Sequence, residues 1–510
     1  MSAPKLLDTM LKILPSRDEF TKNANAGRIL PVYTELPFIH PREVMEHLEG
    51  PQSFLLESIK GPEKIARYSF IGSGPFLTFR VKNGKIEING NSKNISKSRA
   101  PLKRLKELMS SYHPCPDAEL PPFIGGAVGM FSYDFLHYFE RIPRTAQDDL
   151  NIPDADLMLV DTVIAVDHKL QKTFIISCPG AEETIAGKET LNDLWSSCYE
   201  QSVEKINLLK NRISEKPLPS TQKRGKLKAP VEIRHEMGKK YYMDIVKKAK
   251  EYIKAGDIFQ ANLSQRVSAD IGDVTAWQVY RVLSKINPSP FAAYLNMGDY
   301  CISSSSPERL VKTNGNIVET RPIAGTRPRG KDDESDKVMR DDLLLNEKER
   351  AEHLMLIDLE RNDLGKISDY STVEVDELMI TEEYSHVIHI VSNVKGSIIK
   401  GKDCFDAIRA TFPGGTITGV PKVHCMEIID ELEPVTRGPY TGSIGYIGFD
   451  GAMDLNIIIR TFVIKDSTAY VQAGAGIVAD SDPEKEYFET LKKAEALIRT
   501  LEVLQTGEED

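Results

Sequence analysis

Apolar positions recur at two different spacings along this chain of 510 residues, and each spacing predicts a different kind of element. Over residues 239–255 they recur every three or four positions, which predicts an amphipathic helix that ends at Gly256. The same spacing over residues 483–503 predicts a closing helix, with Asp482 as its N-cap and Pro483 at its first position. Each helix therefore has an apolar face that must pack against the rest of the protein.

Short apolar runs bounded by turn residues predict strands on both sides of the middle of the chain. Helical stretches such as 101–112 lie between them, and the last two strands are joined by a predicted hairpin at 465–468. This mixture favours an α+β fold over a strict alternation of strand and helix. The predicted strands cover residues 53–58, 67–72, 157–167, 258–267, 291–297, 300–306, 443–449, 456–464 and 469–476.

One basic stretch, "RPIAGTRPRG" at 321–330, fits neither pattern. Its prolines and glycines make a poor helix and a poor strand, so we predict a stiff loop. Ala324 stands in the middle of it.

A change in composition divides the chain. Residues 214–236 are rich in proline, lysine and serine and poor in apolar residues, as linkers are. We therefore predict an N-terminal part at 1–215, a linker at 216–235 and a C-terminal part at 236–505.

The composition narrows the class of protein. Hydrophobic residues make up 41% and charged residues 27% of the chain, as in soluble globular proteins. A net charge of −10 argues against nucleic acid as the main partner, although local basic residues could still bind a small anion. The six cysteines show no metal-binding spacing. With no signal-peptide pattern and no membrane-length apolar run, we expect a cytoplasmic protein without disulfides.

Two carboxylate pairs are candidates for a metal site. Glu486, Glu489 and Lys493 form a stripe along one edge of the closing helix. Glu349 and Glu352 are three positions apart within 346–365 and share a helix face. Two such helices could hold Mg²⁺, which takes few carboxylates together with water and substrate oxygens. Solvated helix edges with ordinary ion pairs explain both patterns as well.

Other residues are candidates for acid–base chemistry or anion binding. Glu308 follows a strand and could be a general acid, or an ordinary turn glutamate. His386 and His389 would point to opposite faces of a strand, so one of them could act singly as a base, or could simply be packed. The glycine-rich turns at 412–422 and 472–476 could bring backbone N–H groups to a carboxylate, or only turn the chain.

Taken together and in order, these segments resemble the chorismate-utilising enzymes, above all the large subunits (component I) of anthranilate synthases. The resemblance covers about 236–503, and "SFLLES" with "RYSFIG" extends it into the N-terminal part. It implies two stacked, mainly antiparallel sheets flanked by helices, with an N-terminal α+β regulatory part. The motifs are "SPERL" (306–310), "RPIAGTRPRG" (321–330), "AEHLMLIDLERNDLG" (351–365), "YSHVIHIVS" (384–392), "FPGGTITGVPK" (412–422) and "QAGAGIVADSDPEKEYFET" (472–490).

The resemblance also implies roles for single residues. Glu352 and Glu489 would bind Mg²⁺, supported by Glu349 and Glu486. The catalytic residues would be Glu308, which protonates the departing 4-hydroxyl of chorismate, and His389, which assists the loss of pyruvate. The substrate would be bound by Gly325, Thr326, Thr416, Tyr440, Arg460, Gly474, Gly476 and Lys493. Tryptophan, as a feedback inhibitor, would be bound by Leu56, Glu57, Ser58, Asn287, Pro288, Ser289, Pro290 and Phe291.

The nucleophile separates the members of this family. Two positions that carry a lysine in other members are Gln260 and Ala324 here, which points to free ammonia. The chain has no cysteine in a G-x-C-x-G elbow, so a separate glutaminase subunit (component II) would supply the ammonia. The implied products are anthranilate and pyruvate, on the path to tryptophan.

Two alternatives stay open. Phe291, Ala292 and "DLERNDLG" lean toward aminodeoxychorismate synthases of the folate pathway. The other alternative is a non-catalytic, tryptophan-sensing protein with the same fold. The intact set of candidate residues argues against it.

Overall fold

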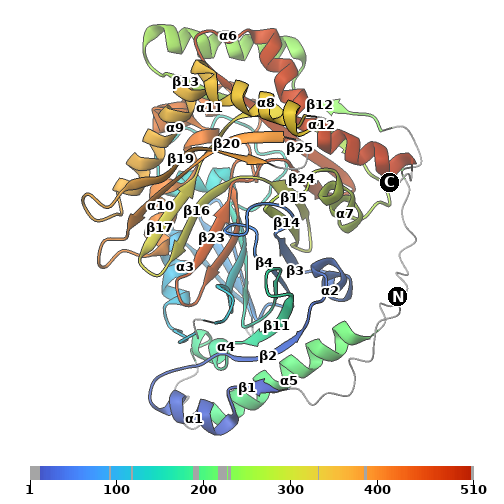
Figure 1. Cartoon of the computed structure of the whole chain (residues 1–510), viewed down its shortest axis with the longest axis vertical. Coiled ribbons are helices and arrows are strands. Elements are labelled where there is room, and N and C mark those ends of the chain that lie inside the picture. Colours follow the sequence, from blue (N-terminus) through green and yellow to red (C-terminus); the bar gives the residue numbers. More distant parts are fainter. Residues whose placement is uncertain are drawn as a thin grey trace.

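The structure is a computed structural model, and it describes residues 12–90, 93–116, 119–187, 194–215, 227, 231–330, 332–383 and 387–506. The predicted linker at 216–235 therefore lies mostly outside the described residues. Two large antiparallel sheets face each other, and helices flank them (Figure 1).

The larger sheet has 13 strands in the described residues. Their order across the sheet is β1 (Ile13–Leu14), β2 (Val32–Pro37), β11 (Lys172–Ser177), β10 (Thr162–Asp167), β4 (Tyr68–Ser73), β3 (Ser53–Glu57), β14 (Phe291–Asn296), β15 (Cys301–Ser306), β24 (Thr461–Lys465), β25 (Thr468–Ile477), β13 (Gln260–Asp270) and β12 (Arg234–His235), and β21 (Gly419–Val420) also pairs with β13.

The second sheet has 12 strands in the described residues. Their order is β18 (Ile323–Pro328), β20 (Val387–Ser397), β17 (Ile317–Arg321), β16 (Arg309–Asn314), β23 (Met453–Asn456), β22 (Ser443–Gly448), β8 (Gly126–Phe131), β9 (Ala155–Val160), β5 (Leu77–Lys82), β6 (Lys85–Asn89) and β7 (Lys93–Lys97), and β19 (Glu374–Glu383) pairs with the other side of β20.

Helices cover the outer faces and the ends of the sheets. They are α1 (Arg17–Asn25), α2 (Pro41–Leu48), α3 (Pro101–Met109), α4 (Ala181–Ile185), α5 (Trp195–Ser214), α6 (Lys239–Ala255), α7 (Ala276–Ile286), α8 (Asp333–Leu345), α9 (Glu347–Gly365), α10 (Cys404–Thr411), α11 (Lys422–Leu432) and α12 (Pro483–Thr506), with the 3₁₀ turns η1 (Tyr133–Tyr138) and η2 (Gly415–Ile417).

The predicted amphipathic helices are confirmed. α6 ends where Gly256 takes the left-handed conformation with φ 84°, which glycine adopts without a steric penalty. At the start of α12, the Asp482 carboxylate accepts the backbone N–H of Glu484 and of Lys485. The hairpin at 465–468 is also confirmed, since β24 and β25 pair across it.

Each sheet is built from both parts of the chain, whose strands form two contiguous blocks that pair at one boundary. β3 pairs with β14 in the larger sheet, and β8 pairs with β22 in the second. The apolar run predicted as one strand at 157–167 is two strands, β9 and β10, which belong to different sheets. The chain passes from one sheet to the other at Asp161, so a single apolar run serves both.

The prediction that 321–330 is a loop is wrong for its middle. Residues Ile323–Pro328 form the edge strand β18 against β20, with a register shift between Ala324 and Thr326. Gly325 lies at this bulge with φ 61°. An edge strand tolerates proline because one side of it needs no partner, and a glycine bulge absorbs the irregularity.

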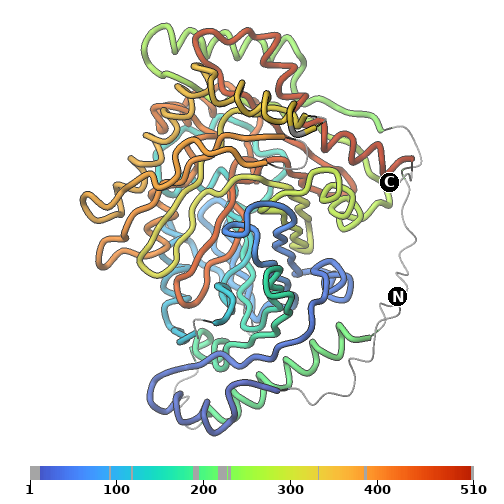
Figure 2. The backbone as a smooth tube through the Cα atoms, viewed as in Figure 1, coloured from blue at the N-terminus to red at the C-terminus, as the bar shows by residue number. Residues whose placement is uncertain are grey.

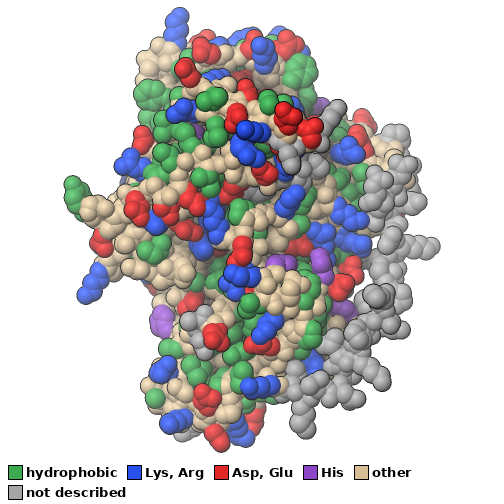
Figure 3. Space-filling model, viewed as in Figure 1, with side chains coloured by type: hydrophobic (Ala, Val, Ile, Leu, Met, Phe, Trp, Pro, Cys, Tyr) green, Lys and Arg blue, Asp and Glu red, His purple; other side chains and the backbone are tan. Residues whose placement is uncertain are grey.

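The core lies between the two sheets, and a second apolar cluster lies beneath α2, α5, α7 and α12. The course of the backbone between these layers can be followed in Figure 2. On the face seen in Figure 3, side chains of both charge signs are mixed. All six cysteines are free thiols. Within the described residues, no helix has the length and apolar character needed to cross a membrane.

Candidate active site

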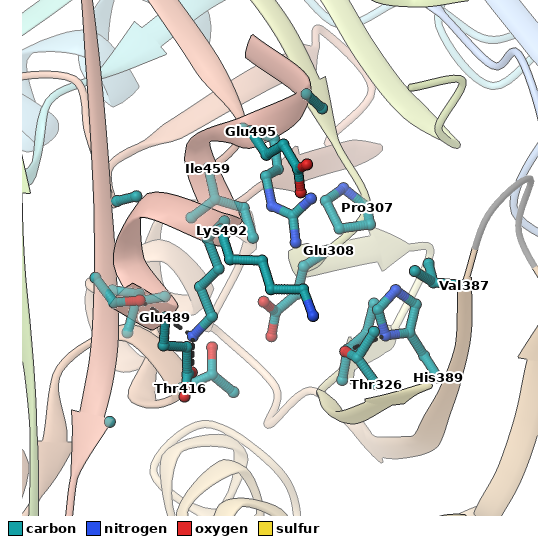
Figure 4. Close-up of a pocket in the computed structure, with 18 of the residues that line it drawn as sticks. Pro307, Glu308, Thr326, Val387, His389, Thr416, Ile459, Glu489, Lys492 and Glu495 are labelled. Atoms are coloured by element: carbon teal, nitrogen blue, oxygen red, sulfur yellow. Dashed lines mark hydrogen bonds and ion pairs between the residues drawn. The ribbon is translucent and has the colours of Figure 1, made fainter. Parts of the chain in front are cut away.

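One cavity of about 1370 Å³ lies where the second sheet, β13, β25 and α12 meet. Residues from distant parts of the sequence point into it (Figure 4). All residues predicted to bind metal or substrate, or to act in catalysis, line this one cavity, together with Gln260 and Ala324. The structure thus brings together sequence segments that are more than 200 positions apart.

Glu308 is a buried carboxyl group at the wall of the cavity. It sits in the turn between β15 and β16, after Pro307, and its side chain is 5% exposed. Burial raises the pKa of Glu308 to about 8. Its Oε1 has no hydrogen-bond partner among the described residues. A protonated carboxyl with one oxygen free toward a cavity is what a general acid requires at neutral pH.

His389 on β20 is held by the neighbouring edge strand. Its Nδ1 lies 3.0 Å from the Thr326 hydroxyl and 3.2 Å from the Gly325 carbonyl oxygen. Because a carbonyl only accepts, Nδ1 carries the proton and the lone pair is on Nε2. Burial lowers the pKa of His389 to about 4, so the ring is neutral at pH 7. His386 lies outside the described residues.

The two glutamate pairs line the cavity from two helices. Glu349 and Glu352 come from α9, and Glu486 and Glu489 from α12. Burial raises the pKa of Glu352 and of Glu486. The neighbouring carboxylate, Glu349 for the first and Glu489 for the second, raises it further. Lys493 forms an ion pair with Glu489 at 2.8 Å.

These carboxylates fit a cation that takes only part of its ligands from protein. Among the described residues no group of three or more acids, histidines or cysteines is arranged as a metal site. Gln260 donates from Nε2 to Glu352 Oε1 at 3.1 Å, which orients that carboxylate toward the cavity. Magnesium commonly takes one or two carboxylates and completes its shell with water and substrate oxygens, and this donor set can supply that.

Arg460 is the candidate anion-binding side chain. No carboxylate among the described residues pairs with it, and burial lowers the pKa of its guanidinium. Its backbone has φ 54°, a strained conformation for a residue other than glycine. Tyr440 lies beside it in the cavity wall. A partly buried guanidinium without a carboxylate partner among the described residues is suited to a planar carboxylate, which it can bind through two parallel hydrogen bonds.

Glycines are required where the wall of the cavity is tight. A Cβ on Gly474 would lie 2.5 Å from Asn262 Oδ1 and 2.8 Å from the Tyr440 hydroxyl. A Cβ on Gly476 would lie 2.4 Å from Gln260 Nε2. Side chains at these positions would displace the polar groups that line the cavity.

The arginines of 321–330 mostly bind acidic side chains of the protein. Arg321 pairs with Glu382 in the interior, and Arg327 pairs with Asp342 of α8 at 2.7 Å. Arg329 pairs with Asp336. Their contribution is therefore to fix β18 against its surroundings, while Ala324 lines the cavity.

The two motifs predicted to bind tryptophan lie side by side. Glu57 on β3 is opposite Ala292 on β14, and the Ser58 hydroxyl donates to the Pro290 carbonyl at 3.3 Å. Glu57 is buried and pairs with Arg42. The eight predicted residues therefore adjoin one another across the sheet, and Asn287 among them also lines the large cavity.

Asn262 and Lys492 line the cavity but were not among the predicted site residues. Asn262 follows Gln260 by two positions on β13, so the period of two along a strand could have indicated it. Figure 4 shows Lys492 extending from α12 into the cavity. It precedes Lys493, which also lines the cavity, and nothing in the helical spacing indicates that two successive lysines both reach it.

Comparisons with known proteins cover most of the chain. The profile described as chorismate binding enzyme matches residues 51–499. Anthranilate synthase component 1 of Acetivibrio thermocellus is 42% identical over 498 residues, which cover 96% of this chain and 98% of that protein. Aminodeoxychorismate synthase component 1 of Bacillus subtilis (strain 168) is 42% identical over 449 residues, which cover 88% of this chain and 91% of that protein.

The solved structures give the same result for the fold. Anthranilate synthase component I from Streptococcus pneumoniae TIGR4 matches with a TM-score of 0.75 at 35% identity, covering 90% of this chain and 97% of that chain. The stacked sheets flanked by helices that the sequence motifs implied are therefore confirmed.

Proposed function

This chain belongs to the chorismate binding enzyme family, and from that premise we propose that it is component I of an anthranilate synthase. It would convert chorismate and ammonia to anthranilate and pyruvate. The observation that carries this proposal is the identity of two cavity residues. Gln260 and Ala324 offer no amine where other family members carry lysine, so a free nucleophile must enter.

The residues of the cavity supply the two steps of this reaction. Arg460 holds a carboxylate of chorismate, while Glu308 gives its proton to the 4-oxygen as the C4–O bond breaks and ammonia adds at C2. His389 then assists the loss of pyruvate from the amino intermediate, and the ring becomes aromatic. Substrate that fills this cavity would limit competition by water.

Glu352 and Glu489 would hold Mg²⁺, with Glu349 and Glu486 beside them. When bound, the ion would draw electron density from the ring carboxylate of the substrate. Gln260 keeps Glu352 oriented for this role through the hydrogen bond from its amide.

Two partners complete the proposal. A glutaminase subunit (component II) would supply ammonia in the cell, since the chain has no glutaminase motif of its own. Tryptophan would bind at the paired motifs on β3 and β14 as a feedback inhibitor, and their direct contact supports a single ligand site there.

A product assay tests the proposed reaction. The protein is mixed with chorismate, Mg²⁺ and an ammonium salt near pH 8.5, and the fluorescence of anthranilate is followed. Steady formation of anthranilate is expected. Its absence would sink the proposal, and any turnover of chorismate would exclude a purely sensing role.

The second candidate function is that of an aminodeoxychorismate synthase. The Bacillus subtilis relative and the residues Phe291 and Ala292 favour it. The same assay is repeated with an aminodeoxychorismate lyase added. Formation of 4-aminobenzoate in place of anthranilate would select this candidate.

A further inference from the structure

A second buried carboxyl group lies behind the wall of the cavity. Glu360 is on α9, its side chain is 5% exposed, and it does not line the cavity. The turn η2 separates it from the cavity: a Cβ on Gly415 would lie 3.5 Å from Glu360 Oε1. The next residue, Thr416, faces the cavity. Glu308 and Glu360 are thus close enough for their charges to interact.

The charges around Glu308 and Glu360 favour one bound proton on this pair. Asp363, one turn after Glu360, is buried and pairs with Lys422 of α11 and with Lys366, the latter at 2.7 Å. With Glu308 the cluster holds three carboxyl groups against two ammonium groups. Burial disfavours an uncompensated negative charge, so one carboxyl group of the cluster remains protonated.

We propose that Glu360 is a positioning residue which, through its own buried charge, keeps the general acid Glu308 protonated when substrate binds. The inference rests on the proposed function, in which Glu308 protonates the departing hydroxyl. It assigns to Glu360 no contact with substrate.

The surroundings decide which of the two holds the proton. Burial and Asp363 raise the pKa of Glu360, whereas Lys422 and hydrogen bonds from Thr320 and from the backbone N–H of Gly415 favour its charged form. Burial and the charge of Glu360 raise the pKa of Glu308 to about 8, although hydrogen bonds from Thr416 and the backbone of Ile323 act in the other direction, and its Oε1 has no partner among the described residues. The charge therefore stays on Glu360 and the proton on Glu308.

Further titratable groups line the cavity that Glu308 borders. Among them are His389 of β20, which is neutral at pH 7, Arg460 from the segment before β24, and Lys492 of α12. The two cations oppose protonation of Glu308, and bound substrate carboxylates would neutralise them. Glu360 then remains the charge that acts on Glu308 throughout turnover.

The pH dependence of kcat tests this in the full chain. Substrates are chorismate, Mg²⁺ and ammonium salt, with the concentration of unprotonated NH₃ kept constant at every pH. Removing the charge in Glu360→Gln lowers the pKa of Glu308, so the alkaline limb of the profile should move down by about one pH unit. At pH values above the alkaline limbs of both proteins, kcat of the variant should be about tenfold lower than that of the wild type. The plateau rate should be the same in both. An unmoved limb overturns the proposal.

Matched variants separate this effect from a general loss of packing. Glu360→Asp keeps the charge and should keep the limb near its wild-type position. Asp134 is buried far along the chain in η1, and burial raises its pKa to about 7. Asp134→Asn should leave the limb in place; an equal shift in this variant would contradict the proposal.

Infrared spectroscopy gives a readout that does not depend on the reaction. In the difference between wild-type protein and Glu308→Gln at pH 7, we expect the carbonyl band of a protonated carboxyl group. The band should fall to half its intensity near pH 8 in the wild-type chain and about one unit lower when Glu360→Gln is the background. No band at pH 7 overturns the inference, even if anthranilate is produced. A band that shifts as expected upholds it, even if the product assay fails.

Discussion

Burial gives two neighbouring residues opposite chemical roles. It raises the pKa of Glu308 to about 8 and lowers that of His389 to about 4, because in each case it disfavours the charged form. Between these values Glu308 holds a proton to give, and His389 is neutral and able to accept one. The proposed acid and base therefore work over the same range of pH, up to about 8.

The first prediction concerns the metal. Replacing Glu489 by glutamine removes a carboxylate on α12 and frees its partner Lys493, so Mg²⁺-dependent turnover should fall by on the order of 100-fold or more. The measurement is a Mg²⁺ titration of anthranilate formation. Glu502→Gln, on the exposed side of the same helix, is the matched control. Wild-type turnover at saturating Mg²⁺ would refute the metal assignment.

A second prediction separates the two chemical steps. His389→Met removes the base but not Glu308, so amine addition continues while loss of pyruvate slows by about 10²–10⁴-fold. Chromatography of a single-turnover mixture should then show the amino intermediate accumulating. His424→Met changes an exposed histidine and serves as the control. Normal anthranilate output from His389→Met would rule out this role.

The third prediction tests whether Ala324 faces the substrate. A lysine there would place an ammonium group and extra volume in the cavity, lowering the ammonia-dependent rate by about tenfold. Steady-state kinetics with varied ammonium salt measures the effect. Ala324→Met adds similar volume without charge and separates the two causes. If neither variant changes the rate, the side chain does not meet the substrate.

At the scale of elements, the bulge in β18 positions the base. Gly325 has φ 61°, and its carbonyl is the acceptor for His389 Nδ1. The adjoining Thr326 places its hydroxyl on the same nitrogen. The bulge takes the Gly325 carbonyl out of the regular ladder, so that it reaches the same ring nitrogen as the Thr326 hydroxyl.

Replacing Gly325 by alanine should therefore damage both stability and activity. The left-handed backbone alone costs about 1–2 kcal/mol for a residue with a Cβ. That Cβ would also lie 2.8 Å from Leu343 Cδ1 and 3.0 Å from Glu349 Oε2. The free energy of unfolding in denaturant and kcat measure the two effects.

Gly315→Ala provides the matched control for this variant. Gly315 has φ 59° in the turn before β17, and a Cβ at this position would meet nothing within 4 Å. The variant should lose the same backbone contribution to stability and leave kcat unchanged. Equal losses of stability in the two variants would show that the contacts around Gly325 carry no weight.

At the scale of the whole molecule, the two parts of the chain share both sheets. β8 lies between β22 and β9, and β3 lies between β4 and β14. Removing residues 1–215 would leave the edges of β14 and β22 without partners and open the core between the sheets. The cavity belongs mainly to the C-terminal part but depends on this shared framework.

We therefore expect the fragment 236–510 to show no cooperative thermal transition by circular dichroism when it is produced alone. Co-expression with the fragment 1–215 should restore the transition and the anthranilate-forming activity, because the sheets can then form from two chains. A fragment 236–510 that melts cooperatively on its own would show that the shared strands are dispensable.

Local patterns were sufficient for elements whose stability depends on their own spacing and caps. The helices predicted at 239–255 and 483–503, the final hairpin, and the position of Glu349 and Glu352 on one helix face followed from periodicity and capping residues. The ordered motifs implied the fold and the members of the cavity. The sequence alone therefore determined these local elements and which residue types are available for chemistry.

Only the tertiary structure decided where a residue meets partners that are distant in sequence. The run at 157–167 was divided between two sheets, and part of 321–330 became an edge strand because β20 offered it a partner. Glu360 became a neighbour of Glu308 through the turn at 415–417. Burial and long-range charge set the pKa of such groups, and both depend on contacts that spacing along a chain does not contain.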